Sequence, residues 1–207
     1  MTERFLDDPD VQRMLRIREG DAVAFEEFVS AYAPVLINFM RRFVGNDVVA
    51  EDLAQEVFLK VHRAAPTYEP TARFKTWLLT IATNLCLNEK RRSGRRSHQS
   101  LEALGEGDEV GRSRDWIADE GPMPEARLES GELQEKVRAA IAALPESQRA
   151  VVLMARYEQL SYVEMAQATG LTIMAVKSLL NRAKTNLKKH LSREIRDFLV
   201  APPEENA

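Results

Sequence analysis

The sequence is poor in the residues that build covalent or metal-bound frameworks. Among 207 residues there is one cysteine, Cys86, so no internal disulfide can form. The three histidines, His62, His98 and His190, are scattered, and none stands at metal-ligand spacing from a second cysteine or from a paired carboxylate. We therefore predict no metal and no cofactor.

Long apolar runs are also missing. No stretch approaches the roughly 20 apolar residues of a membrane-spanning helix. The first ten residues, MTERFLDDPD, lack the apolar core of a signal peptide, and the 44% hydrophobic content is that of a soluble globular protein. These absences predict a cytoplasmic protein that does not insert into a membrane.

An excess of positive charge is lacking too, since the formal net charge is −3. That sum argues against a nucleic-acid partner, but the placement of charge matters more than its total. One basic block runs from Lys90 to Arg96 and a second from Lys177 to Lys189, and acids dominate between Glu102 and Glu125. Two basic patches on either side of an acidic tether predict contact with nucleic acid at two places.

The stretch from Ser161 to His190 predicts two helices joined by a tight turn. Ser161 and Glu164 have capping-box spacing, Gly170 suits a left-handed turn, and Thr172 is the expected N-cap of the second helix. The inward face of that second helix is expected to hold Ile173, Val176, Leu180, Ala183 and Leu187. The opposite face is polar and basic, as in a helix-turn-helix that enters the major groove of DNA. A solvated helical hairpin is the simpler alternative.

Helical periodicity predicts an all-α chain. The expected helices cover residues 10–19, 21–43, 47–64, 74–92, 125–143 and 146–157, followed by the two helices of the helix-turn-helix. Residues 65–73 contain two prolines and are expected to form a loop. Residues 94–125 are rich in glycine, serine and acids and read as a linker. We expect two small helical domains, 1–93 and 126–207, joined by a flexible acidic linker.

The predicted helix 47–64 has a mixed outer face. Its outward-facing residues are Val48, Glu51, Asp52, Gln55, Glu56 and Leu59. Carboxylates beside exposed aliphatic side chains suit a partner surface, whereas a purely acidic face is usually just solvated. A di-iron carboxylate site is excluded because no histidine stands three residues after any of these acids.

The predicted helix 74–92 carries a threonine face opposite an apolar stripe. The stripe consists of Phe74, Trp77, Leu78, Ile81 and Leu85, and the other side holds Thr76, Thr80 and Thr83 with Asn84 and Arg91 near its edge. Hydroxyls and amides beside arginines are groups that meet phosphates and unpaired bases. The alternative is a plain polar face whose basic last turn complements the helix dipole.

Four stretches together resemble the bacterial RNA polymerase sigma factors, specifically the compact extracytoplasmic-function (ECF) group that keeps only the second and fourth conserved regions. They are AEDLAQEVFLKVHRA at 50–64, FKTWLLTIATNLCLNEKRR at 74–92, LPESQRAVVLMARYEQLSYVEMAQATGL at 144–171 and AVKSLLNRAKTNLKKHL at 175–191. Their order and separation carry the resemblance, which covers roughly residues 21–191. It implies a non-enzymatic subunit that directs core RNA polymerase to promoters.

The resemblance also implies roles for individual residues. Docking on the clamp of the polymerase's largest subunit would fall to Glu51, Asp52, Gln55, Phe58 and Leu59. Capture of the unpaired minus-10 DNA strand would fall to Tyr68, Lys75, Thr76, Thr80, Thr83, Asn84, Arg91 and Arg92. Reading of the duplex minus-35 element would fall to Thr172, Met174, Lys177, Ser178, Asn181, Arg182 and Lys184. The family further implies contact with the polymerase flap and control by an anti-sigma factor.

Two positions of the second basic block depart from the family pattern. Leu179 and Lys184 stand where the family often has arginines. Leu179 removes a possible phosphate contact, and Lys184 keeps the positive charge but lacks the bidentate geometry of arginine. The promoter sequence is therefore not predictable from the chain.

Two other functions remain open at this point. A conventional helix-turn-helix regulator would bind DNA without polymerase and would have no use for the mixed face of helix 47–64. A nucleic-acid enzyme with this module as its targeting domain would need a catalytic carboxylate or metal cluster, and we find none in the sequence.

Overall fold

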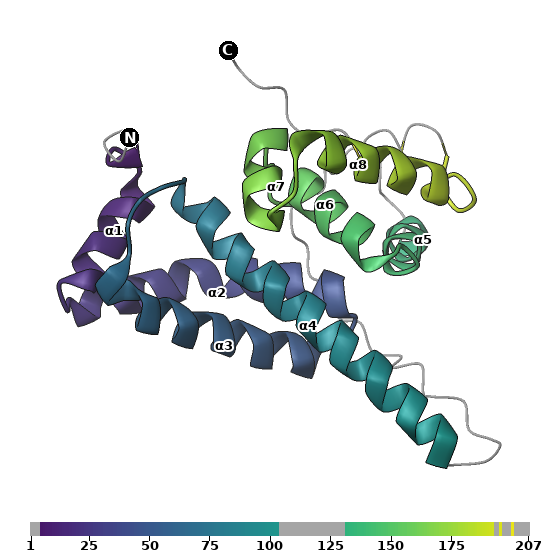
Figure 1. The fold of residues 1–207 in the computed structure, drawn as a ribbon, viewed down its shortest axis with the longest axis horizontal. Helices are drawn as coiled ribbons and strands as arrows, with labels where there is room; N and C mark the ends of the chain where they lie inside the picture. The colour runs from purple at the N-terminus through teal and green to yellow at the C-terminus, as the bar shows by residue number, and fades with distance from the viewer. Residues whose placement is uncertain (1–4, 104–130, 193–194, 196–199, 201–207) are drawn as a thin grey trace.

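A computed structural model describes residues 5–103, 131–192, 195 and 200 (Figure 1). Every regular element within these ranges is a helix, as the periodicity predicts. Most of the predicted linker, residues 104–125, lies outside the described residues, and so does the tail 201–207.

Three capped helices begin the chain. They are α1 (Pro9–Arg18), α2 (Ala22–Val44) and α3 (Asp47–Ala64). The side chains of Asp8, Asp21 and Asn46 accept hydrogen bonds from backbone N–H groups in the first turns of these helices. Gly45 ends α2 in the left-handed conformation. Short polar caps and this glycine therefore set the helix boundaries close to where the sequence places them.

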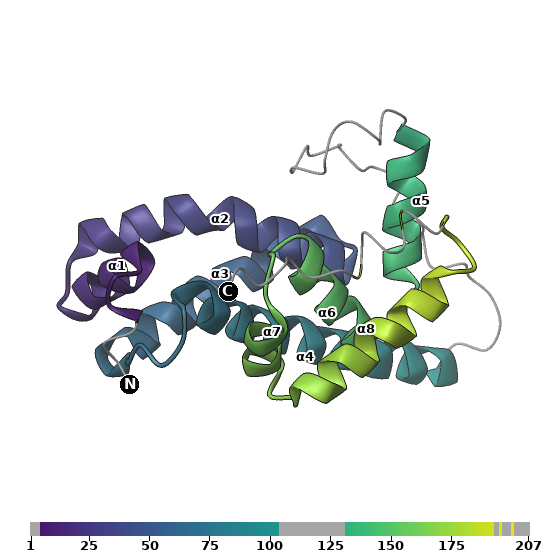
Figure 2. The same cartoon turned by 90° about the horizontal axis from the view of Figure 1, so that it is seen from above.

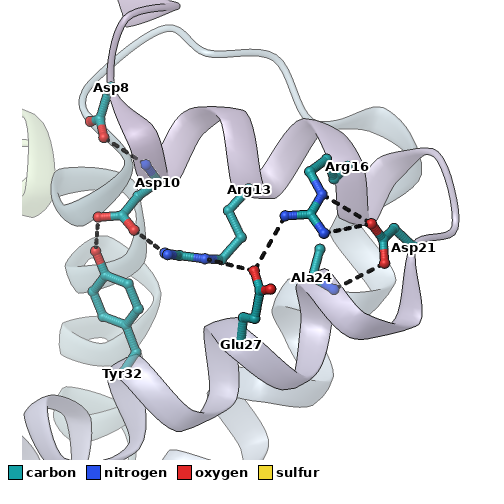
Figure 3. A network of polar contacts seen from close by, with 8 residues as sticks. All are labelled: Asp8, Asp10, Arg13, Arg16, Asp21, Ala24, Glu27 and Tyr32. Carbon is teal, nitrogen blue, oxygen red and sulfur yellow. Dashed lines mark hydrogen bonds and ion pairs between the residues drawn. The ribbon is translucent and has the colours of Figure 1, made fainter.

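A polar network fastens α1 onto α2 (Figure 3). The Tyr32 hydroxyl donates to Asp10, whose carboxylate also pairs with Arg13. Arg16 pairs with Asp21 at 2.8 Å and with Glu27 at 3.3 Å. Burial, followed by the bond to Asp10, raises the pKa of Tyr32 above its usual value. These contacts position α1 against α2.

The fourth long helix exceeds its predicted length. After the short 3₁₀ helix η2 (Ala65–Thr67), α4 runs over Phe74–Ala103, whereas the sequence predicts an end near residue 92. The glycine and serines after residue 92 suggest a linker, but the segment 93–103 contains no proline, and six of its eleven residues are good helix formers (two Arg and one each of Gln, Leu, Glu and Ala). The residues predicted as the start of the linker thus continue the helix.

An aromatic cluster joins α2, α3 and α4. The Phe28 ring stacks edge-on against Phe58 at 5.4 Å and against Phe74 at 5.5 Å between centroids. The α2 helix is long and apolar enough to cross a membrane by length and composition alone. In this structure, however, one face of α2 supplies core residues that pack against the neighbouring helices, including Phe28, Leu36 and Phe39.

Four shorter helices form the C-terminal half. They are α5 (Gly131–Ala142), α6 (Glu146–Arg156), α7 (Tyr162–Thr169) and α8 (Ile173–Leu187). Val176, Leu180, Ala183 and Leu187 of α8 are buried, as predicted. Ile173 is not, because 40% of its side chain is exposed. It is the first residue of α8 and directly follows the exposed turn residues Leu171 and Thr172.

The two halves of the chain pack against each other. The views in Figure 1 and Figure 2 both show α7 alongside α4, and α6 approaching the end of α2. The buried apolar residues of both halves form one continuous cluster. The sequence did not predict this contact.

Candidate nucleic-acid interface

The turn between α7 and α8 is fixed by local hydrogen bonds. Ser161 and Glu164 form the predicted capping box at the start of α7. Gly170 ends α7 with a φ of +68°, and its N–H donates to the carbonyl of Ala166. Thr172 then caps α8 by accepting from the Ala175 N–H at 3.2 Å. This is a helix-turn-helix whose second helix is held at a defined angle to the first.

The exposed face of α8 gathers the residues predicted to read duplex DNA. Lys177, Ser178, Asn181 and Arg182 are all exposed and lie at helical spacing on one side. Met174 precedes them and is 75% exposed. Such a row of donors, acceptors and one apolar side chain has the chemistry of base and phosphate contacts.

The two other members of the predicted minus-35 set lie at the border of this face. Thr172 is exposed and already caps α8, whereas Lys184 is half-buried and held by other interactions. The ammonium of Lys177 lies 4.9 Å from the centre of the Tyr162 ring of α7. This cation–π contact holds one basic side chain of α8 against α7.

The outer face of α3 is open, as the sequence predicts. Glu51, Asp52 and Gln55 are exposed, and Leu59 is 55% exposed. Phe58 differs, because its ring is half-buried against Phe28 and belongs mainly to the aromatic cluster. Carboxylates, an amide and exposed aliphatic side chains therefore share one surface of α3.

The predicted minus-10 residues of α4 and the preceding loop are divided between surface and interior. Asn84, Arg91 and Arg92 are exposed and Lys75 and Thr80 are half-buried, whereas Tyr68, Thr76 and Thr83 are buried. The Tyr68 ring packs on Trp77 at 5.0 Å, and burial raises the pKa of its hydroxyl to about 12. The hydroxyls of Thr76 and Thr83 are buried without a hydrogen-bond partner.

Sequence reasoning missed three charged residues that connect the halves. Arg149 of α6 is buried and donates to the carbonyls of Phe43, Ala142 and Leu144. Glu158, between α6 and α7, is buried beside Lys75, and Arg73 pairs with Glu164. An arginine just before the apolar run AVVLMA is a signal for a buried cation, but nothing in the sequence names its distant partner.

Metal chemistry has no candidate in the described parts of the chain. Within residues 5–103 and 131–192, no group of three or more His, Cys, Asp or Glu side chains is placed to hold an ion.

Comparison with known proteins identifies the family of the chain. The family model for Sigma-70 region 2 matches residues 28–96, and that for Sigma-70 region 4 matches residues 134–187. The ECF RNA polymerase sigma-E factor of Escherichia coli is 30% identical over 198 residues, covering 95% of this chain and 100% of that protein. The chain belongs to the ECF RNA polymerase sigma factors. The ECF sigma factor SigW of Bacillus subtilis is 29% identical over 180 residues, covering 87% of this chain and 95% of that protein.

Two solved structures share the fold of this ECF sigma factor. CnrH, solved in complex with the cytosolic domain of CnrY, aligns with a TM-score of 0.60 at 21% identity, covering 88% of this chain and 96% of that chain. The sigma factor RpoE of Bartonella quintana, solved with the anti-sigma factor NepR, aligns with a TM-score of 0.59 at 24% identity, covering 80% and 94% respectively.

Membership of this family confirms the resemblance that the sequence showed to ECF sigma factors, and with it the function that the resemblance implies. This ECF sigma factor directs RNA polymerase to promoters and is not an enzyme. The helix-turn-helix is therefore part of region 4, and helices α2 to α4 carry region 2. A stand-alone regulator and a nucleic-acid enzyme are both set aside.

Proposed function

We propose that this sigma factor grips a promoter at two points, with α8 reading the duplex minus-35 element and α4 holding the unpaired minus-10 strand. The observation that carries the proposal is the single exposed face of α8, where Met174, Lys177, Ser178, Asn181 and Arg182 stand in one row. Thr172 and Lys184 extend the row at either end. Amide and guanidinium groups would read base edges, and the lysines would anchor on phosphates.

The outer face of α3 is the proposed docking surface for core polymerase. Its exposed members are Glu51, Asp52, Gln55 and Leu59, with the edge of Phe58 beside them. The partner in this proposal is the clamp of the polymerase's largest subunit, and region 4 would contact the flap. An acidic and aliphatic surface suits a basic partner with an apolar centre.

The minus-10 strand would lie along α4. Lys75, Thr80, Asn84, Arg91 and Arg92 are at least partly exposed and offer cations, a hydroxyl and an amide to phosphates and unstacked bases. Tyr68, Thr76 and Thr83 complete the proposed set, but they are buried in this structure. Strand capture by these three requires a rearrangement that exposes them.

The domain boundaries and the remaining partners belong to the same proposal. We place region 2 within residues 1–93, a linker at 94–125 and region 4 within 126–207. An anti-sigma factor is the proposed regulator, supported by the complexes in which CnrH and the Bartonella sigma factor were solved. A protein that serves RNA polymerase would act in the cytoplasm.

Reconstituted transcription tests the proposal. Purified core polymerase with the full chain is expected to give transcripts that start at one defined site on a cognate promoter. The double variant Asp52→Arg with Gln55→Ala should weaken binding to core by at least tenfold, because a charge reversal at the centre of an interface costs several kcal/mol. Core binding is measured by fluorescence anisotropy of labelled sigma factor.

A matched control separates docking from charge. Glu135→Arg with Gln134→Ala makes the same exchange on the exposed side of α5, away from α3, and should leave core binding unchanged. Equal affinity of the α3 variant and the wild type would remove α3 as the docking surface. A protein that protects promoter DNA alone and never binds core would overturn the proposal as a whole.

A further inference from the structure

The start of α8 exposes several apolar side chains to solvent. Leu171 is 41% exposed, Ile173 40% and Met174 75%, so three large apolar side chains lie open within four residues. Isolated exposed apolar residues are common on protein surfaces, whereas adjacent ones mark a contact surface. Met174 is the most exposed large apolar residue in the described parts of the chain. It is therefore the residue whose exposure most needs a partner.

Met174 lies opposite the buried side of α8. With about 3.6 residues per turn, Ser178, Asn181 and Thr185 follow it on one narrow stripe, and all of them are exposed. Figure 1 shows α8 on the outer side of α6. The buried side packs α8 onto α6 and consists of Val176, Leu180, Ala183 and Leu187. Any partner that contacts both Ser178 and Asn181 therefore also meets Met174.

The charge around Met174 favours DNA as that partner. Residues 173–187 of α8 contain three basic side chains and no Asp or Glu. The first turns of α6 and α7 carry Glu146 and Glu164, but the first turn of α8 has no acidic residue. Its positive dipole end is thus available to phosphates. An apolar side chain within a basic surface suits an anionic partner that also presents apolar groups, and thymine presents its 5-methyl group in the major groove.

The backbone that carries Met174 is held firmly. Thr172 accepts a hydrogen bond from the Ala175 N–H at 3.2 Å, and the Gly170 N–H donates to the Ala166 carbonyl. The N-terminal residues of a recognition helix are the ones that reach base edges. The methionine side chain itself is flexible and has a polarizable sulfur, so it adapts its shape to an apolar group. A fixed backbone with an adaptable apolar side chain suits contact with a methyl group.

We propose that Met174 is a specificity-determining residue, which contacts the 5-methyl group of a thymine in the major groove of the minus-35 element. The proposal rests on the proposed function, since it takes α8 to read the minus-35 duplex. It adds that this sigma factor prefers a T·A pair at one position of the element and recognises that pair without a hydrogen bond from Met174. The methyl group beside the O4 acceptor is what distinguishes the thymine edge from the edges of the other bases.

Removal of one methyl group from the DNA tests the contact. The wild-type chain with core polymerase selects active promoters from a pool of randomised duplexes, and sequencing of the transcribed templates defines the minus-35 element. Each thymine of that element is then replaced by deoxyuridine, which keeps the O4 acceptor and lacks only the methyl group. Fluorescence anisotropy measures holoenzyme binding to each duplex. At one thymine the replacement should weaken binding by about fourfold, the effect of exposing one methyl-sized apolar group.

Variants of Met174 should change this response. The Met174→Ala holoenzyme is expected to bind the thymine and deoxyuridine duplexes equally, because the methyl group has lost its partner. Met174→Leu keeps an apolar side chain and should retain the preference for thymine. Met174→Gln has a similar length but ends in an amide, which pairs well with adenine. Selection with Met174→Gln should therefore shift from thymine to adenine at that position.

The matched control is Val23→Ala. Val23 is 60% exposed in the first turn of α2 and belongs to none of the sets predicted for core docking, minus-10 or minus-35 contact. This variant removes apolar atoms from a surface that is not proposed to touch DNA, so its holoenzyme should keep the full response to deoxyuridine. Circular dichroism verifies that the helices of each variant are intact.

Three results contradict the proposal. The selected minus-35 element could contain no T·A pair, or the wild type and Met174→Ala could lose the same affinity on deoxyuridine. Loss of core binding by Met174→Ala with an intact deoxyuridine response would instead identify the apolar turn as a protein contact. The proposed function fails by a different result: the wild-type chain with core polymerase gives no transcripts from a defined start site, or base changes in the minus-35 element leave its binding unchanged.

Discussion

Cys86 is the one thiol of the chain, and its role is packing. It is buried in α4, and burial raises the pKa of its thiol from 9.0 to about 12. A thiol that cannot ionise near neutral pH is a poor nucleophile, so the folded protein has no reactive cysteine among its described residues. The sequence suggested this filler role from the position of the cysteine in an apolar pattern.

The raised pKa predicts a loss of stability in alkali. Because the unfolded thiol ionises near pH 9 and the folded one near pH 12, the folded state is favoured fully below pH 9 and loses this contribution as pH rises through that window. The slope is at most about 1.4 kcal/mol per pH unit. Urea unfolding at about pH 8 and about pH 10 should show a smaller loss for Cys86→Ala than for the wild type.

A residual loss in Cys86→Ala is expected from Tyr68, whose pKa is raised to about 12 by burial. An identical pH dependence in the variant and the wild type would mean that Cys86 does not contribute.

At the scale of the helix, most of the fold follows from caps and periodicity. The bounds predicted for α3 agree with the structure because Asn46 caps one end and a proline loop follows the other. The predicted end of α4, near residue 92, does not agree with the observed end at Ala103. The glycine and serines after residue 92 oppose helix formation less than their neighbours favour it. Polar patterning also misplaced Thr76 and Thr83, since a wheel shows which face is polar but not what covers it.

The helix-turn-helix turn gives a prediction at this scale. Gly170 has a φ of +68°, and a Cβ built there would meet nothing within 4 Å, so the cost of Gly170→Ala is purely conformational. A left-handed residue with a Cβ costs about 1–2 kcal/mol. Thermal or urea unfolding should show a destabilisation of that size.

The converse change serves as its control. Gln159, in the α6–α7 turn, already holds a φ of +55° with a side chain. Gln159→Gly relieves that strain but adds flexibility to the unfolded chain, so its effect should lie near zero. A loss as large as that of Gly170→Ala would contradict the backbone argument.

At the scale of the whole chain, Arg149 connects parts that are distant in sequence. Its buried guanidinium donates hydrogen bonds to the carbonyls of Ala142 and Leu144, at and just after the end of α5, and to the carbonyl of Phe43 near the end of α2. Arg149→Met should destabilise the protein by about 2–4 kcal/mol, because three carbonyl groups lose a charged donor in the interior. Arg63→Met, at an exposed site on α3, should change the stability by less than about 0.5 kcal/mol.

Equal unfolding midpoints for these two variants in urea would show that the hydrogen bonds of Arg149 do not stabilise the fold. The sequence could not predict its role, because the carbonyl that it reaches on α2 lies far away along the chain. Motifs predicted the two candidate DNA-binding surfaces, but the contact between the two halves of the chain depends on tertiary packing that no local pattern records.

The shared core has a consequence for how the chain unfolds. The buried apolar residues of both halves form one cluster, and α7 packs on both α4 and α8. Unfolding of either half would expose apolar surface that the other half now covers, so we expect the two halves to unfold together in one cooperative transition.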